Sequence, residues 1–240
     1  MTQQHPQLEE LIAVLERLRA PGGCAWDREQ THESLVRYLL EETYELIDAI
    51  ESGNREEMIE ELGDVLYQVI FHSDIAAHTP GEEFTLEDVA ANMTAKMIGR
   101  HPHVFGDATA ETADDVMAVW DDLKRVEKPT RTSVLDGVPQ GMPALALADK
   151  LLGKAHKLGI TRLDFAEVPA AMTAPAVVKS PTTIPTTIPT TMPVPVPETE
   201  QELGDLLLSI VATARSNGLD AERALRASLR ELQDDMRAAE

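Results

Sequence analysis

The sequence predicts an all-α protein, a helical bundle made of two helical-hairpin repeats of which the second is degenerate. Apolar residues recur with helical spacing through most of the 240 residues, and strand-like alternation is absent. A short segment, Glu61-Leu62-Gly63-Asp64-Val65-Leu66, recurs further along as Glu202-Leu203-Gly204-Asp205-Leu206-Leu207. These observations indicate helices throughout and a duplicated unit.

The predicted helices follow from apolar spacing, capping residues and chain breakers. They lie at 7–20, 30–52, 54–78, 85–99, 112–128, 143–158, 199–216 and 220–237. Thr85 with Asp88 forms a variant of the capping box, and so does Thr112 with Asp115. Gly53 suits the left-handed end of one helix, and the Asn that follows it suits the start of the next.

A proline-rich stretch separates the two predicted repeats. Eight of the chain's 15 prolines lie within 168–198, where a Pro-Thr-Thr unit repeats. Such a stretch cannot form a helix or bury a core, which indicates a disordered or polyproline-II-like linker. We therefore divide the chain into a first domain at 1–160, a linker at 161–198 and a C-terminal hairpin at 199–240.

Four carboxylates are expected to converge between the helices at 30–52 and 54–78. If Gly53 marks the turn, Glu45 and Glu61 are equally far from it along the chain, and so are Glu42 and Asp64. The three-residue spacing within each helix places both of its acids on one face. Like charges this close repel and favour a bound cation, and an all-oxygen set favours a hard one such as Mg²⁺. The alternative, an acidic face in solvent, does not explain why the acids mirror each other.

Composition excludes several classes of partner. A formal charge of −21 argues against binding to nucleic acid or to an anionic membrane surface. The sequence begins with polar residues and has no apolar run long enough for a membrane span, so neither a signal peptide nor a membrane anchor is expected. The single cysteine, Cys24, cannot form an intrachain disulfide and suggests a reducing compartment. We expect a cytoplasmic protein.

Four sequence blocks in a fixed order resemble one family. The pattern E-E-x-x-E at 41–45 followed by E-x-x-D at 61–64 resembles the all-α nucleoside triphosphate pyrophosphohydrolases, above all the MazG proteins. The other blocks are Gly23-Cys24-Ala25-Trp26-Asp27 with Gln30-Thr31-His32, then Arg100-His101-Pro102-His103-Val104-Phe105, then Trp120, Lys124 and Glu127-Lys128. Ala25 stands where the family usually has Pro. The resemblance covers residues 8–160.

The resemblance implies a Mg²⁺-dependent hydrolase, with Mn²⁺ as a substitute cation. It would cleave (deoxy)nucleoside triphosphates between the α and β phosphates, giving monophosphate and pyrophosphate, in house-cleaning of the nucleotide pool. The implied metal ligands are Glu42, Glu45, Glu61 and Asp64, and the implied catalytic carboxylates are Glu41 and Glu45. The implied substrate-binding residues are Lys96, Arg100, Trp26 and Lys124. A homodimer is expected, because one four-helix module offers too little surface to enclose a nucleotide.

The second repeat lacks half of this pattern. Glu202 and Asp205 keep the ligand spacing, but the proline-rich chain before them cannot supply a helix with E-E-x-x-E. Glu231 and Asp235 stand where the first repeat has its two cations. We expect a structural, non-catalytic repeat.

Two other interpretations stay open. One is a relative with narrower substrate choice, a phosphoribosyl-ATP or dUTP/dCTP pyrophosphohydrolase, which shares the fold and the acids. The other is a catalytically dead regulatory protein that binds nucleotides. The degraded repeat favours the second interpretation, whereas the intact first motif argues against it.

Overall fold

The computed structural model describes residues 5–116, 119, 123, 127, 130–160 and 197–239. Every regular element in these ranges is a helix and no strand occurs there, so the predicted all-α class is confirmed. No helix in the described ranges is long and apolar enough to cross a membrane. The chain forms two compact units, Met1–Glu127 and Lys128–Glu240, which we describe separately.

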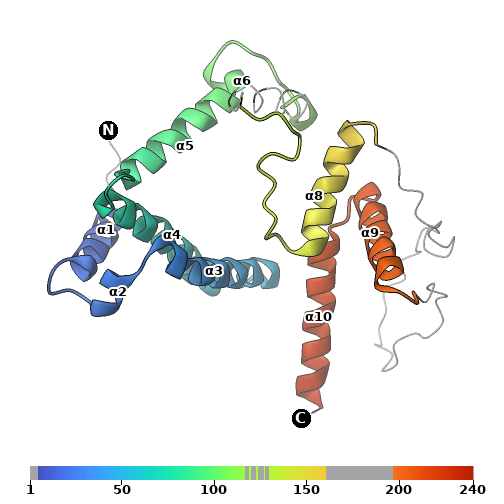
Figure 1. The fold of residues 1–240 in the computed structure, drawn as a ribbon, viewed down its shortest axis with the longest axis horizontal. Helices are drawn as coiled ribbons and strands as arrows, with labels where there is room; N and C mark the ends of the chain where they lie inside the picture. The colour runs from blue at the N-terminus through green and yellow to red at the C-terminus, as the bar shows by residue number, and fades with distance from the viewer. Residues whose placement is uncertain are drawn as a thin grey trace. The chain divides into compact units, whose positions relative to one another are not determined.

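The first unit contains the helices predicted at 7–20, 30–52, 54–78 and 85–99, with ends shifted by a residue or two. They are α1 (Pro6–Arg19), α3 (His32–Ser52), α4 (Arg55–His78) and α5 (Leu86–Arg100) (Figure 1). Two short helices were not predicted, α2 (Ala25–Glu29) and α6 (Pro102–Phe105). Of the helix predicted at 112–128, residues 112–116, 119, 123 and 127 are described, and all of these but 112 are helical.

The hairpin of α3 and α4 is defined by its caps. Thr31 and Ser34 form a reciprocal capping box at the start of α3. Gly53 ends α3 in the left-handed region, at φ 73°, where a residue without Cβ is favoured. The Asn54 side chain then accepts the backbone N–H groups of Glu56 and Glu57 at the start of α4. The turn that the sequence predicted is therefore present, with each residue in its predicted role.

The core of the first unit lies where α1, α3, α4 and the start of α5 meet. Its buried members are Leu15, Leu35, Ile70, Phe71 and Ile75, and the side chains packed against them are Leu11, Ile12, Tyr38, Tyr67 and Leu86. Full burial of a large apolar side chain contributes about 1.5–3 kcal/mol. This core fixes one end of the α3–α4 hairpin, and the acidic cluster lies nearer the turn.

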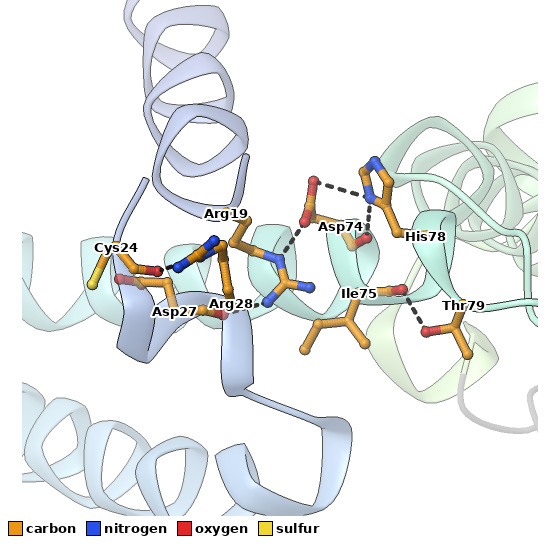
Figure 2. Close-up of polar contacts among 8 residues, drawn as sticks. All are labelled: Arg19, Cys24, Asp27, Arg28, Asp74, Ile75, His78 and Thr79. Carbon is orange, nitrogen blue, oxygen red and sulfur yellow. Dashed lines mark hydrogen bonds and ion pairs between the residues drawn. The ribbon is translucent and has the colours of Figure 1, made fainter. Parts of the chain in front are cut away.

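Arg19 joins three helices around this core (Figure 2). Its Nε donates to Asp74 Oδ2 on α4 at 2.5 Å, and its Nη1 donates to the backbone carbonyl of Asp27 on α2 at 2.5 Å. The guanidinium also lies 5.1 Å from the centre of the Phe71 ring. Because the Arg19 side chain is only 14% exposed, these charge-assisted contacts are largely shielded from water and hold α2 against α4.

The link between α1 and α2 requires a glycine. A Cβ atom at Gly23 would lie 2.2 Å from the carbonyl oxygen of Leu18, far inside van der Waals contact. The close approach lets the backbone N–H of Cys24 donate to that carbonyl at 2.7 Å. Gly23 therefore sets the position of α2 and of Trp26 on it.

The second unit contains α8 (Ala144–Lys157), α9 (Glu200–Ser216) and α10 (Ala221–Ala238), which match the predictions at 143–158, 199–216 and 220–237. Leu152 and Val211 are buried between them, and Arg215 Nη1 binds both carboxylate oxygens of Asp149 at 2.9 and 3.0 Å. Helix α8 packs on α9 and α10, so the compact units divide after Glu127, before the predicted boundary at 160. Nearly all of the predicted linker at 161–198 lies outside the described residues.

Candidate metal centre

Three of the four predicted metal ligands come together on the α3–α4 hairpin. Glu42 and Glu45 on α3 and Glu61 on α4 each offer a carboxylate oxygen, and these oxygens lie within 4.8 Å of one another. Asp64 is outside this group of three, but it is close enough for its charge to raise the pKa of both Glu42 and Glu61. Glu41, the other predicted catalytic acid, is exposed on α3 beside the cluster.

The electrostatics of the cluster favour a cation. Burial raises the pKa of Glu42, and the charges of Asp64 and Glu45 raise it further. Burial also raises the pKa of Glu61, with further increases from Glu45 and Asp64. Both effects oppose the ionised carboxylates, and a bound cation would reverse them. The residues present therefore fit a metal better than they fit an empty acidic face.

One oxygen in the cluster has no partner. Glu61 Oε2 is shielded from solvent and has no hydrogen bond within the part of the chain that the structure describes. A shielded carboxylate oxygen without a donor is unfavourable and needs an explanation. Together with the all-oxygen set of Glu42 and Glu45, this atom fits a hard divalent cation.

The two predicted cations lie on another helix. Lys96 and Arg100 are half-buried on α5, which among the described helices contacts α4 and α6. Figure 1 shows α5 running away from the α3–α4 hairpin. The pKa values of Glu42 and Glu61 are shifted by burial and by neighbouring acids, with neither cation among the causes. The placement of Lys96 and Arg100 beside the carboxylates therefore stays a prediction.

Arg100 is held by an acid within the same unit. Its Nε donates to Glu127 Oε1 at 2.7 Å and its Nη2 donates to Glu127 Oε2 at 2.5 Å, a bidentate arrangement. This bond raises the pKa of the guanidinium. A phosphate that binds Arg100 has to compete with the Glu127 carboxylate.

Trp26 lies on α2, next to the hairpin. Its ring meets Tyr38 edge to face, with ring centroids 5.6 Å apart, and its side chain stays 48% exposed. Tyr38 is one helical turn before Glu42 on α3, so an exposed aromatic surface lies near the carboxylates. Lys124, the remaining predicted substrate-binding residue, lies outside the described residues, and so does Trp120.

Gln68 is a buried polar residue in line with the acids that was not predicted as part of the site. Gln68 is 6% exposed, and its Oε1 has no hydrogen-bond partner among the described residues. It follows Asp64 by one helical turn on the face of α4 that carries Glu61. The available signal was a Gln amid apolar residues at this spacing. A buried Gln side chain is unfavourable unless it has hydrogen-bond partners.

Comparison with known proteins identifies the domain that contains these residues. Residues 30–105, which contain α3, α4 and α5, match the MazG nucleotide pyrophosphohydrolase domain. An uncharacterised 26.1 kDa protein of Streptomyces cacaoi is 42% identical, over 98% of this chain and 83% of its own length.

Two relatives carry functional names. The nucleoside triphosphate pyrophosphohydrolase/pyrophosphatase MazG of Thermotoga maritima is 40% identical, over 92% of this chain and 81% of its own length. The nucleoside triphosphate pyrophosphohydrolase of Escherichia coli is 35% identical, over 91% of this chain and 81% of its own length. With this much of both chains aligned and the acidic hairpin inside the matched domain, the chain belongs to the MazG family.

Proposed function

We propose that the protein hydrolyses (deoxy)nucleoside triphosphates between the α and β phosphates, releasing monophosphate and pyrophosphate, as a house-cleaning enzyme of the nucleotide pool. The observation that carries this proposal is the group of Glu42, Glu45 and Glu61, whose carboxylate oxygens lie within 4.8 Å of one another inside the family domain. The names of the relatives from Thermotoga maritima and Escherichia coli support the substrate class.

We also propose that the hairpin holds Mg²⁺, or Mn²⁺ in its place, through Glu42, Glu45, Glu61 and Asp64. When bound, the cation would supply positive charge that offsets the phosphate oxygens and favours attack on phosphorus. The shielded oxygen of Glu61 and the raised pKa values of Glu42 and Glu61 support this assignment.

The carboxylates also give the site its base. Glu45 is exposed within the cluster, so its carboxylate can accept a proton from an approaching water, and the neighbouring Glu41 is the alternative. As the water oxygen attacks the α phosphorus, its proton passes to the carboxylate. The bond from the α phosphorus to the bridging oxygen breaks, and pyrophosphate leaves with the electron pair.

A second copy of the chain would complete the site. The outward faces of α3 and α4 carry apolar side chains that are about half exposed: Val36, Leu40, Tyr44, Ile59, Leu62 and Leu66. Patches of this kind on a soluble chain mark interfaces. We propose that a second copy of the chain packs on this apolar face, giving a homodimer that encloses the nucleotide.

Pyrophosphate release from purified protein with Mg²⁺, across a panel of nucleotides, tests the proposal. We expect release from several triphosphates, its loss with chelator, and its loss in Glu42→Gln. Glu56→Gln, which changes an exposed acid in the first turn of α4, should behave as wild type. Activity confined to phosphoribosyl-ATP or to dUTP and dCTP would identify a narrower enzyme. No release under any condition would favour the regulatory interpretation.

A further inference from the structure

Two histidine rings and one carboxylate connect three segments on the core side of the hairpin. The ring of His32, the first residue of α3, lies edge to edge with that of His72 on α4, with ring centroids 5.0 Å apart and planes 2° apart. Their Nδ1 atoms are 2.7 Å apart. His32 Nε2 lies 2.8 Å from Oε2 of Glu82, in the loop between α4 and α5. His32 lies in one of the sequence blocks that resemble the family, but the proposed metal site does not use this contact.

The distances define where the protons are. Two Nδ1 atoms at 2.7 Å form a hydrogen bond only if one carries a proton and the other does not. The Glu82 carboxylate can only accept, so His32 Nε2 is the donor toward it. Neutral His32 then has a bare Nδ1, which accepts from the Nδ1–H of His72. The two neutral rings therefore have opposite tautomers.

The remaining ring atom fits this assignment. His72 Nε2 is shielded from solvent and has no hydrogen-bond partner among the described residues. In the assigned tautomer this atom carries no hydrogen, so the structure buries a weak acceptor. The opposite tautomer would bury an N–H donor, and orphaned N–H groups are rarer in folded proteins.

We propose that His32, His72 and Glu82 form a proton-sensitive clasp, which joins the start of α3 and the loop before α5 to α4 and loses its link to α4 when both rings are protonated. The clasp accommodates one additional proton, because an imidazolium at His32 can donate from both nitrogens. A second proton places N–H groups on both Nδ1 atoms and like charges on adjacent rings, which removes the bond. The link between the start of α3 and α4 is then lost, while the protonated His32 keeps its contact with Glu82, so the loop and the start of α3 separate from α4 together.

The surroundings of the rings determine whether the closed clasp gains or loses stability as the pH falls. Burial lowers the pKa of His72, and the neighbouring His32 lowers it further. An unfolded or opened chain therefore takes up protons below about pH 6.5, before the closed clasp does. The clasp stabilises the closed state above that pH, and this contribution is lost as the pH falls.

Few charges compete with this arrangement. The charged or titratable groups near the rings along the chain are Glu33 on α3, Asp74 and His78 on α4, Glu82 and Glu83 on the loop, and Glu87 and Asp88 on α5, with Arg19 of α1 bonded to Asp74. Arg19 and Asp74 are paired with each other, and Asp88 is held by Thr85. Glu82 is thus the acid bonded to the ring pair.

The position of the clasp gives it a consequence for activity. The loop that it holds leads directly into α5, which carries Lys96 and Arg100. If these cations bind the triphosphate, which rests on the proposed function, His32 and His72 are positioning residues for them. Tests of the tautomers and of clasp opening do not depend on this role.

Nitrogen-15 NMR of the histidines in the full chain tests the tautomers directly. We expect a neutral His72 with its proton on Nδ1, a neutral His32 with its proton on Nε2, and protonation of His72 at lower pH than an exposed histidine. Assignment uses His32→Gln and His72→Gln. If both rings carry the proton on Nε2, or if His72 titrates like the exposed His78, the proposal is overturned.

Hydrogen exchange of residues 79–85 between pH 8 and pH 5 tests opening. After correction for intrinsic exchange, the open fraction in wild type should rise about tenfold per pH unit for each proton taken up. His72→Phe should remove this pH dependence, whereas His78→Gln should retain it. Should His72→Phe fail to fold, His72→Gln serves instead, because it also removes the titrating ring while keeping a polar side chain on α4. Equal pH dependence in wild type and in whichever of these variants folds would contradict the clasp. Changes in pyrophosphate release alone would bear only on the proposed function.

Discussion

The two hairpins use the same short acidic segment at different places in a helix. In α4, Glu61 lies beyond the first turn and faces Glu42 and Glu45 of α3. In α9, Glu202 lies in the first turn, where its carboxylate accepts the backbone N–H of Glu198 at 2.7 Å and its own N–H donates to Thr199. Glu61 belongs to a cluster of acids, whereas Glu202 caps a helix. The candidate metal centre therefore depends on the opposing helix and not on the acidic motif alone.

The same substitution in both hairpins tests whether Glu61 and Glu202 have different roles. Glu61→Gln removes a proposed metal ligand while keeping side-chain size, and we expect kcat for pyrophosphate release to fall by at least about 100-fold. Glu202→Gln should leave kcat unchanged, because this side chain makes only local capping contacts. The measurement is steady-state pyrophosphate release at saturating Mg²⁺. Near wild-type kcat in Glu61→Gln would remove Glu61 from the site.

The second test compares metal binding without turnover. Mg²⁺ at about 100 times its dissociation constant should stabilise the folded chain by about 2.7 kcal/mol, because it binds the folded state only. A non-hydrolysable triphosphate should enlarge the effect. Thermal unfolding with and without Mg²⁺ should show stabilisation in wild type and in Glu202→Gln, and none in Glu61→Gln. An equal shift in all three proteins would indicate nonspecific binding.

The third test uses pH in the absence of metal. Because the pKa values of Glu42 and Glu61 are raised above 4.5, the folded state holds protons that the unfolded state has already released. Their contribution to stability is therefore present below pH 4.5 and is lost as the pH rises through the folded-state values. Glu61→Gln should flatten this decline in the free energy of unfolding between pH 4.5 and 7. Identical slopes in variant and wild type would show that the cluster is not electrostatically strained.

The smallest expected effect belongs to the second hairpin. Replacing Glu202 and Asp205 together by Ala should leave turnover within error, since the first hairpin carries the proposed chemistry. The loss of the contact at the start of α9 should lower stability by about 0.5–1 kcal/mol. Urea unfolding measures the second quantity and pyrophosphate release measures the first. A large loss of turnover would make the second repeat a working half-site.

Local signals predicted the α3–α4 hairpin closely. Thr31, Gly53 and Asn54 each take the backbone role that their chemistry favours, and helical spacing then places the acids on facing sides. Both signals act within a few residues, so no knowledge of the tertiary fold was needed. The short helices α2 and α6 were missed because helices of five and four residues show no periodicity.

The tertiary relations were less predictable. Sequence spacing put Lys96 and Arg100 on a helix, but nothing local indicates that α5 packs on α4 and α6 or that Glu127 binds Arg100. The contact between His32 and His72 joins residues 40 positions apart and depends on how α3 packs on α4. The packing of α8 on α9 and α10 also depends on tertiary contacts. The repeated acidic segment lies in α9 alone, so it does not indicate this packing.

The start of α2 suggests a simple route to a more heat-tolerant protein. Ala25 is the first residue of this helix, where a proline ring already has the required φ and the missing N–H would have no helical partner. Cys24 before it is extended, at φ −73° and ψ 130°, which is the conformation that a following proline prefers. Ala25→Pro should therefore raise stability by about 0.4–1 kcal/mol through the lower entropy of the unfolded chain, which thermal unfolding would measure. The residue at position 25 can therefore change the temperature at which the protein unfolds without altering the candidate metal centre.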